Sequence, residues 1–579
     1  MEDLKVEDVH VFSTWLRSLS PVTCTLYLAE VLVVLLLGFY IYNWPFAYYR
    51  LTFKNLPGPP SDSWLTGNLK YIIKSPPCVP HVEWCEEYGP TIRYQLLFGT
   101  HRFLTMDTVA MSFILSHGDI FPKPPRTRKN IADILGNGLI AAEGEDHKRQ
   151  RKALNPSFSP ATIRGMMPIF YDKSFQLRAK WLSIIEGDES EQPSPTPEKD
   201  IDKVQGGRKM DVMHFLAKTT LDIIGVAGFN YDFNALSEPH NELSGAYMNM
   251  MQAGMDVTLF VILQSIIPIL QHIPTKRDRI IKESKKKTQE IGLRIINEKK
   301  RMVMETCLAG LDEKEDIGKD LLSILIKANM TPDLKSNQKL SDVEILDQIT
   351  TFMLAGNETS STALTWILYC LCIYPKSQGL LREECLSVQE DQPSLETLNA
   401  LPYMDAVIRE VLRLYSPVPG TMRETSRDVV VPLGTPVKGR DGTMIESVNL
   451  KKGIDIFIPV IGLNRLSMIW GPDAAEFKPE RFLSFPSDNG STRFEPMNVP
   501  GVWGNLLTFL GGTRNCIGYR LALAEIKVIL FVLMRSFEFE ELQSKPQIEK
   551  KTSIVMRPRV IGEESHGLQM PLMVKPLPI

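Results

Sequence analysis

Apolar residues along most of this chain recur every three or four positions, which is the spacing of an amphipathic helix. Four long segments follow this pattern, and we expect each to be a helix: Thr219–Gly228, Arg277–Met304, Ser341–Tyr374 and Leu398–Tyr415. Ser341 and Glu344 have the spacing of a capping box at a helix N-terminus. Alternating runs are short and predict strands at Ile92–Leu97, Val429–Val437, Asp455–Pro459 and Ile554–Met556. The pattern therefore predicts a mainly α fold with small β-sheets, of the α+β class.

The N-terminal segment lacks this periodicity because nearly all of its residues are apolar. Residues 22–42 carry one charge, Glu30, and a helix over this span is long enough to cross a bilayer. A cleaved signal peptide fits less well, because acidic residues precede the span and the apolar run is long. Acidic residues dominate 1–21 and basic residues follow the span, so the positive-inside rule predicts a short lumenal tail and a cytosolic body. We expect a single-pass transmembrane helix.

Proline and polar clusters mark two further segments. Residues 43–60 end in LPGPP, whose prolines favour an extended, semi-rigid hinge. Residues 186–209 are polar and rich in Pro and Ser, so we expect a flexible surface insertion. No repeat and no other change of composition divides the remainder, which predicts one large domain over 61–579.

Composition excludes several classes of protein. The 579 residues are 44% hydrophobic and 23% charged with a net charge of −3, which gives no reason to expect nucleic acid as a partner. None of the eight cysteines forms a CxxC pair or a disulfide-like array. A structural zinc site or a disulfide-stapled secreted domain is therefore not expected.

One cysteine has unusual neighbours. Cys516 lies in FLGGTRNCIG, directly before an apolar, helix-forming run. Gly511, Gly512 and Gly518 permit positive φ and close approach of the backbone to something flat or bulky. Arg514 adds a positive charge, and N–H groups at a loop-to-helix junction stabilise a thiolate. The residues alone leave three interpretations open: a metal site, a reactive thiol, or a buried small residue in an ordinary turn.

The loop matches FxxGxRxCxG at every specified position, and so resembles the heme-binding loop of the cytochrome P-450 family. The resemblance implies that Cys516 is the thiolate axial ligand of the iron in heme b. It also implies that Phe509 packs near the sulfur side of the heme and that Arg514 faces a propionate. Gly512 and Gly518 would keep side chains away from the sulfur, so that backbone N–H groups can tune it. Similar segments run from LPGPP to MRPRVIGEESHGLQMPL, so the resemblance covers nearly the whole chain and implies a catalytic domain over 61–579.

The helix expected over 341–374 contains the sequence AGNET, in which Ala355 and Gly356 precede Glu358 and Thr359. The residues alone fit an ordinary buried helix, or a local distortion where the threonine hydroxyl competes for a main-chain carbonyl. The segment resembles the family's AGx[DE]T motif on the helix that crosses the distal heme face. This implies two catalytic residues: Thr359 hydrogen-bonds dioxygen at the heme, and Glu358 relays protons to it.

Two more motifs precede the cysteine loop. EVLRLYSPVP places Glu410 and Arg413 three residues apart on one helix face, where such pairs usually form a surface ion pair, and FKPERF contains Arg481. They resemble the family's ExxR and PERF motifs. The resemblance implies a structural Glu–Arg–Arg network behind the heme.

Three basic residues are candidates for binding the heme propionates. GEDHKRQRKALNPSF resembles the family helix usually written WxxxR; His147 stands where Trp is usual, and Arg151 matches. Both side chains can donate to a carboxylate, although a basic, solvated helix face remains the alternative for His147. Arg423, after PVPGTM, occupies a position that faces a propionate in many relatives.

By family position, the substrate contacts come from segments that are mostly apolar: 122–139, 255–270, 353–356, 418–422 and 562–568. Ala355, Gly356, Val418 and Thr421 are the candidate contact residues within them. An apolar small molecule such as a terpenoid, a steroid or a fatty-acid-like compound would be desolvated there. Residues 255–270 could equally be core or membrane-surface residues.

The resemblance implies a monooxygenase that uses O2 and takes electrons from NADPH through a separate FAD/FMN reductase. The helix at 144–158 and the polar insertion look most like fungal members, which points to secondary metabolism, with terpenoid tailoring as the hypothesis. We expect residence in the endoplasmic reticulum membrane, in contact with lipid. An acidic face of the reductase is expected to dock on a set of basic residues: Lys148, Arg149, Lys152, Arg520 and Lys527.

Two other functions are compatible with the same motifs. One is a heme-thiolate enzyme that catalyses desaturation or rearrangement. The other, from a different class, is a heme-binding sensor or carrier without turnover. The intact Glu358–Thr359 pair favours oxygen activation over rearrangement of a peroxide.

Overall fold

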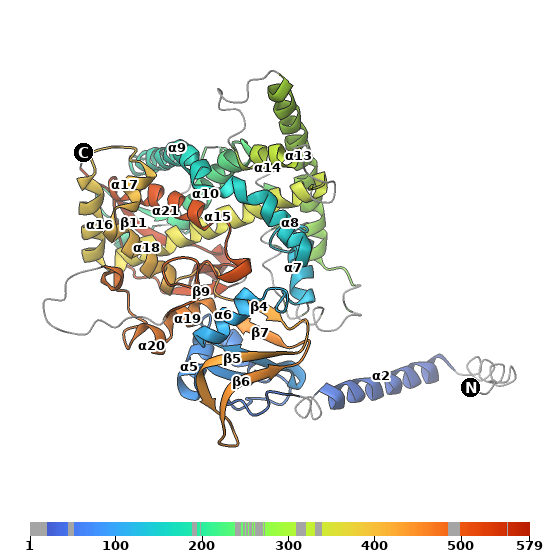
Figure 1. The fold of residues 1–579 in the computed structure, drawn as a ribbon. Helices are drawn as coiled ribbons and strands as arrows, with labels where there is room; N and C mark the ends of the chain where they lie inside the picture. The colour runs from blue at the N-terminus through green and yellow to red at the C-terminus, as the bar shows by residue number, and fades with distance from the viewer. Residues whose placement is uncertain are drawn as a thin grey trace.

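The computed structural model describes residues 20–43, 51–187, 194–196, 198–237, 273–308, 320–330, 339–483, 498–552 and 554–578, and isolated residues between 245 and 270. Most helices gather in one body, two of the sheets lie at one end of it, and the N-terminal helix α2 projects away (Figure 1). The predicted α+β class is confirmed by this arrangement.

The long helices form the body of the molecule. Their bounds in chain order are α9 (Pro160–Ile185), α10 (Val212–Phe229), α13 (Lys276–Leu308), α15 (Asp342–Ile373), α18 (Pro402–Leu414) and α21 (Tyr519–Met534). Shorter helices connect or flank them: α2 (Pro21–Asn43), α4 (Leu69–Lys74), α5 (Val79–Tyr88), α6 (Thr108–Ser116), α7 (Pro125–Leu135), α8 (Gly144–Leu154), α14 (Leu321–Met330), α16 (Pro375–Ser387), α17 (Leu395–Asn399), α19 (Val460–Arg465) and α20 (Ser467–Trp470).

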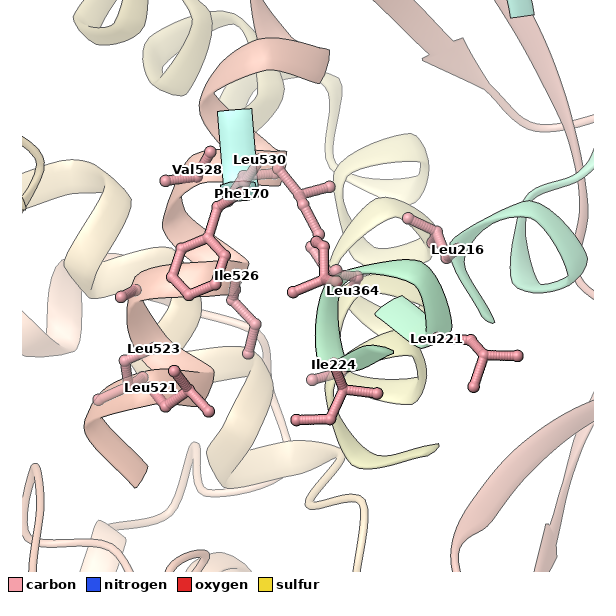
Figure 2. Close-up of a cluster of buried hydrophobic side chains, with 14 of the residues drawn as sticks. Phe170, Leu216, Leu221, Ile224, Leu364, Leu521, Leu523, Ile526, Val528 and Leu530 are labelled. Carbon is pink, nitrogen blue, oxygen red and sulfur yellow. The ribbon is translucent and has the colours of Figure 1, made fainter. Parts of the chain in front are cut away.

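Helix α15 lies at the centre of the helical body, and most of its side chains are buried. Its N-terminus has the predicted capping box: the Ser341 hydroxyl accepts from the Glu344 N–H, and the Glu344 carboxylate accepts from the Ser341 N–H. The helix packs against α10, α13, α18 and α21. Figure 2 shows part of this core, where apolar side chains of neighbouring helices meet: Phe170, Leu216, Ile224, Leu364 and Ile526.

One predicted helix is wrong in its extent. The segment Leu398–Tyr415 is not a single helix but the end of α17 followed by α18. Pro402 is the first residue of α18, and it has no N–H with which to continue the preceding helix. A proline at this position is a start signal that the apolar periodicity did not reveal.

Four small sheets complete the fold. The four-stranded sheet has the order β1 (Thr91–Gln95), β2 (His101–Thr105), β7 (Asp455–Ile458) and β4 (Thr421–Glu424). The other sheets are the pair β5 (Val429–Lys438) and β6 (Met444–Leu450), the pair β9 (Ile548–Thr552) and β10 (Met556–Val560), and a three-stranded sheet of β3 (Arg208–Asp211), β11 (Pro571–Pro576) and β8 (Phe537–Glu540). The strand predicted over Ile554–Met556 corresponds to β10, which begins only at Met556, the last residue of the predicted range.

The N-terminal helix α2 is apolar and exposed along its length. Among the described residues, the helix that is long and apolar enough to cross a membrane by itself is α10, but 72% of that span is buried, as in a core helix. The apolar stretch of α2 is the shorter Thr25–Phe39. The chain that follows packs on the body: Phe53 and Leu56 are buried, and the Arg93 N–H donates to the carbonyl of Pro57.

Several predicted segments lie partly outside the described residues. These are the first residues of the expected hinge, part of the insertion 186–209 and most of 255–270. Where the insertion is described, Thr196 and Asp202 are buried, and Asp202 accepts a hydrogen bond from the Ser544 N–H.

Candidate functional site

The loop around Cys516 is held by main-chain contacts. The Cys516 N–H donates to the carbonyl of Phe509, and α21 begins three residues after the cysteine. A Cβ at Gly511 would lie 1.7 Å from the carbonyl oxygen of Pro500, and one at Gly512, where φ is +64°, would lie 2.1 Å from that of Leu115. The close approach expected at these two glycines is therefore to the protein's own backbone, which leaves no room for a side chain.

The Cys516 thiol differs from the other cysteines that the structure describes. Five of them are buried, whereas Cys516 has an exposed surface. The protein atoms around its sulfur nevertheless desolvate it, which raises the pKa of the Cys516 thiol, and a hydrogen bond from Gly518 and the charge of Arg151 partly offset this effect. A raised pKa disfavours the interpretation as a reactive thiol. A bound metal ion would deprotonate such a sulfur outright, so the site fits a metal ligand better.

Arg151 fixes the cysteine loop. Its Nη1 donates to the main-chain oxygen of Asn515 at 2.7 Å and its Nη2 to the side-chain oxygen of the same residue at 2.6 Å. Phe509, at the other end of the loop, packs edge-to-face on Trp503 and tilted against Tyr519. The structure thus joins the predicted residues Arg151, Phe509 and Cys516 in one local arrangement.

A group of basic side chains lies around a single carboxylate, Glu143. Arg514 forms an ion pair with Glu143 and donates to the carbonyl of Ala142, and the Lys123 Nζ lies 3.4 Å from the Glu143 Oε1. Arg423 is also buried, and its Nη1 donates to the Thr421 hydroxyl and to the carbonyl of Met422. His147 is buried beside these charges. We call Lys123, His147, Arg423 and Arg514 the basic cluster.

The basic cluster carries more positive charge than Glu143 can neutralise. Desolvation, with repulsion from Arg514, lowers the pKa of Lys123 to about 7 and that of Arg423 to about 10. Desolvation and the charges of Arg514, Lys123 and Arg151 lower the pKa of His147 to about 3, so this ring is neutral near pH 7. Buried cations that repel one another are stabilised by an anion. The donor set therefore fits a ligand with two carboxylates, as heme b has.

Lys123 was missed by the sequence reasoning. It lies in FPKPP, within a segment that was assigned only to substrate contacts. The one sequence feature that could have indicated a role for Lys123 is its position between prolines. Prolines fix the backbone and so restrict where a neighbouring side chain can reach.

Helix α15 carries the predicted catalytic pair. The Thr359 hydroxyl donates to the carbonyl of Ala355 at 2.6 Å, which is the competition for a main-chain carbonyl that the sequence suggested. Ala355 is partly exposed. A Cβ at Gly356 would lie 2.8 Å from Ile224, so this glycine lets α10 approach α15 closely. Gly356 therefore has a packing role besides its predicted substrate contact.

Glu358 is buried and forms an ion pair with Arg557 of β10. Desolvation raises the pKa of Glu358, and the charge of Arg557 and its hydrogen bond work against that rise. The sequence of this segment, MRPRV, gives no local sign that Arg557 contacts Glu358. On the neighbouring helix α21, burial raises the pKa of Glu525 to about 8, and the Ser360 hydroxyl partly offsets this.

The predicted Glu–Arg–Arg group lies together in the structure. The Arg413 Nε and Nη2 donate to the two carboxylate oxygens of Glu410, each at 2.8 Å, and both side chains are fully buried. The Arg481 Nε lies 3.6 Å from Glu410, while its Nη1 donates to Asp473 at 2.9 Å.

The expected docking surface needs one correction. Lys527 is buried on α21 and donates to Asp405 and Asn399, so it is not available to a partner. Arg149 is largely committed to Glu344 and Asp146. Lys148, Lys152 and Arg520 are exposed, as a docking residue must be. Lys527 was expected on the surface, but α21 is buried on nearly all sides, so this lysine is neutralised inside the protein.

The candidate substrate contacts Val418 and Thr421 are both partly exposed. The Val418 carbonyl accepts from the Ser416 hydroxyl, and the Thr421 hydroxyl accepts from Arg423 of the basic cluster. Val418 and Thr421 therefore lie in the segment directly before Arg423 of the basic cluster.

Comparison with known proteins agrees with this site. The family model described as Cytochrome P450 matches residues 57–562. Two proteins of the fungus Postia placenta, Cytochrome P450 monooxygenase 128 and 205, are 42% and 41% identical to this chain over 91% and 90% of its length, and each match covers 93% of the relative. Cytochrome P450 monooxygenase claQ of Ampulloclitocybe clavipes is 35% identical over 90% of this chain and 92% of its own.

A match of this extent defines the class of protein. The chain belongs to the cytochrome P-450 family of heme-thiolate proteins, and the relatives it resembles are fungal monooxygenases. It is thus an oxidoreductase of the oxygen-incorporating kind, with iron, heme and a cysteine ligand.

Proposed function

We propose that this chain is a membrane-anchored monooxygenase that oxidises an apolar small molecule, a terpenoid or a steroid, in fungal secondary metabolism. Heme b, when bound, supplies the activation of O2. The chain contributes the sulfur ligand, the charges that hold the propionates and the groups that move protons. The observation that carries the proposal is that one loop holds both Arg514, a member of the basic cluster, and the exposed thiol of Cys516.

Each proposed role follows from the contacts of the side chain. Cys516 is the iron ligand, because its sulfur is exposed on a loop that main-chain contacts hold in place. Arg423 and Arg514, with Lys123 and His147, bind the propionates. Arg151 and Gly518 keep the cysteine loop in position. The structural residues Glu410, Arg413 and Arg481 bind no ligand, since they satisfy one another and the main chain.

Thr359 and Glu358 are proposed to deliver protons. The Thr359 hydroxyl must donate to the reacting oxygen and be resupplied, and Glu358 is the adjacent group that can take a proton from solvent. Ala355, Gly356, Val418 and Thr421 are the proposed substrate contacts, with apolar surroundings that would exclude water from the reaction.

The cellular setting is part of the proposal. The exposed apolar helix α2 is proposed as a single-pass anchor in the endoplasmic reticulum membrane, with the catalytic domain in the cytosol. Electrons are proposed to come from a separate NADPH-dependent FAD/FMN reductase. Its acidic face would meet the exposed side chains of Lys148, Lys152 and Arg520.

The test is expression of the full chain with a fungal reductase in a microbial host, followed by product profiling on a panel of terpenes and steroids. We expect at least one product that contains one oxygen atom from isotope-labelled O2. The Thr359→Ala variant should keep its heme and consume NADPH while product formation falls by roughly 100-fold. Spectral binding of panel compounds with no turnover would instead indicate a sensor or carrier, and a dehydrogenated product without label would indicate desaturation.

A further inference from the structure

The ion pair between Glu358 and Arg557 joins two parts of the molecule that are far apart in the sequence. Glu358 is on α15, and Arg557 is the second residue of β10. The exposed fractions of the two side chains are 7% and 13%, so the pair is mostly buried but keeps some contact with solvent. Among the described residues, Arg557 is the charged group whose contacts lower the pKa of Glu358.

The backbone of Arg557 is fixed relative to α15. The indole Nε1 of Trp366, two turns beyond Glu358 on the same helix, donates to the carbonyl of Met556 at 3.0 Å. The Met556 N–H donates to the carbonyl of Pro417 at 2.8 Å. Both hydrogen bonds act on the residue directly before Arg557, so the guanidinium is presented to Glu358 from a rigid support.

The other groups near this carboxylate do not compete for it. Asn357, the preceding residue of α15, accepts from the Thr220 hydroxyl of α10, and both side chains are neutral. Glu525 of α21 faces Ser360. Lys551 of β9 is opposite Arg557 in the strand register but is exposed. Arg557 is therefore the cation that the fold assigns to Glu358.

We propose that Arg557 is a positioning residue of this site, which keeps the buried Glu358 carboxylate ionised and fixed beside Thr359. In that form Glu358 takes a proton from solvent and passes it to the Thr359 hydroxyl, which gives up its own proton to the reacting oxygen. Glu358 and Thr359 each gain one proton and release one proton in this sequence, and no electrons are transferred. This inference rests on the proposed function, because it specifies how the acid of the proton-delivering pair is controlled.

The physical reason is the cost of burying a charge. Without Arg557, the desolvation that raises the pKa of Glu358 would act unopposed, so the pKa would rise further. Without the ion pair, proton donation by a neutral Glu358 would leave a buried carboxylate with no cation beside it, which opposes the transfer to Thr359. Arg557 stabilises that carboxylate, so the ion pair determines how readily Glu358 releases its proton to Thr359, and the carboxylate then accepts the next proton.

The test is an infrared titration of the holoenzyme, in which the carboxylic acid band of Glu358 is identified by its absence in Glu358→Gln. In Arg557→Gln we expect the pH midpoint of this band to rise by about one unit or more. Arg557→Lys, which keeps the charge, should have a midpoint between that of the wild type and that of Arg557→Gln. The matched control is Arg559→Gln, because Arg559 follows on the same strand but pairs with Glu549; its midpoint should equal the wild-type value.

Two results would overturn the proposal. One is an equal midpoint in the wild type and Arg557→Gln, or an equal shift in Arg559→Gln. The second contradicting result would be a protonated Glu358 in the wild-type protein at pH 7.5, because Arg557 would then not keep this carboxylate ionised. The carbon monoxide spectrum of each variant reports separately whether heme and thiolate are in place, so failure of the proposed function is distinguished from failure of this inference.

Discussion

Arg413 and Arg423 are both buried, with exposed fractions of 0% and 2%, but they meet different surroundings. All five N–H donors of Arg413 are used: two bind the carboxylate of Glu410, and three bind the carbonyls of Asn464, Ala474 and Glu476. Arg423 has no carboxylate within ion-pair distance among the described residues. Its hydrogen bonds go from Nη1 to Thr421 and Met422.

The difference separates a structural arginine from one that serves a ligand. A buried charge that the protein satisfies completely stabilises the fold and binds nothing further. A buried charge beside other cations is stabilised in part by the one shared carboxylate, Glu143, and further when another anion binds. The surplus positive charge of the basic cluster therefore indicates a binding site for an anion. The Glu410–Arg413 pair, whose hydrogen bonds are all made within the protein, indicates a structural role.

The largest effect is expected from breaking the Glu410–Arg413 pair. Arg413→Ala removes both hydrogen bonds that Arg413 donates to the buried Glu410 carboxylate and leaves Arg481, 3.6 Å away, as a more distant cation. This should lower the free energy of unfolding by about 3–5 kcal/mol. Thermal unfolding and heme content of the purified full chain measure this loss. As a control, Lys148→Ala removes an exposed ion pair with Glu145 and should change stability by less than about 1 kcal/mol. An Arg413→Ala protein with the wild-type melting temperature would contradict the structural assignment.

A smaller and different effect is expected in the basic cluster. Arg423→Gln removes a cation that the protein itself does not neutralise, so the melting temperature of the heme-free chain should stay the same or rise. Heme should dissociate about tenfold faster, because one charge-assisted hydrogen bond to a propionate is lost. Transfer of heme to apomyoglobin gives the rate. An unchanged rate, or a loss of stability as large as in Arg413→Ala, would remove the distinction between the two arginines.

The smallest effect is a dependence of heme retention on pH. The pKa of Lys123 is about 7 without an anion and is raised when a propionate binds, so heme binding takes up a proton above pH 7. Affinity should therefore be full below about pH 7 and fall as pH rises from 7 to 9, with heme release several-fold faster at the upper end. In Lys123→Met this dependence should disappear. A wild-type release rate that is flat over this range would exclude Lys123 from the site.

The parts of the site that the sequence predicted are those defined by local spacing. The capping box at Ser341 and Glu344, the hydrogen bond of Thr359 within its own helix, and the pair Glu410–Arg413 each depend on residues three or four positions apart, and the structure has all of them. Helical periodicity fixes such contacts without knowledge of the fold.

The parts that were missed depend on contacts between distant segments. Arg557 reaches Glu358 across 199 positions, and Lys123 lies beside Glu143, whose other partner, Arg514, is 371 positions further along the chain. The wrong expectation for Lys527 has the same origin, because its partner Asp405 is 122 positions away. The pairing of a charge with a distant partner is decided by tertiary packing, which no local pattern contains.

The central claim is that Cys516 is the ligand of a heme iron, and the most direct measurement is the spectrum of the reduced, carbon-monoxide-bound protein. The full chain should show the strongly red-shifted Soret band of thiolate ligation. Cys516→His should bind heme without that band, while Cys385→Ser, at a buried cysteine away from the loop, should keep it. The same red-shifted band in Cys516→His, or its absence from heme-loaded wild-type protein, would contradict the account.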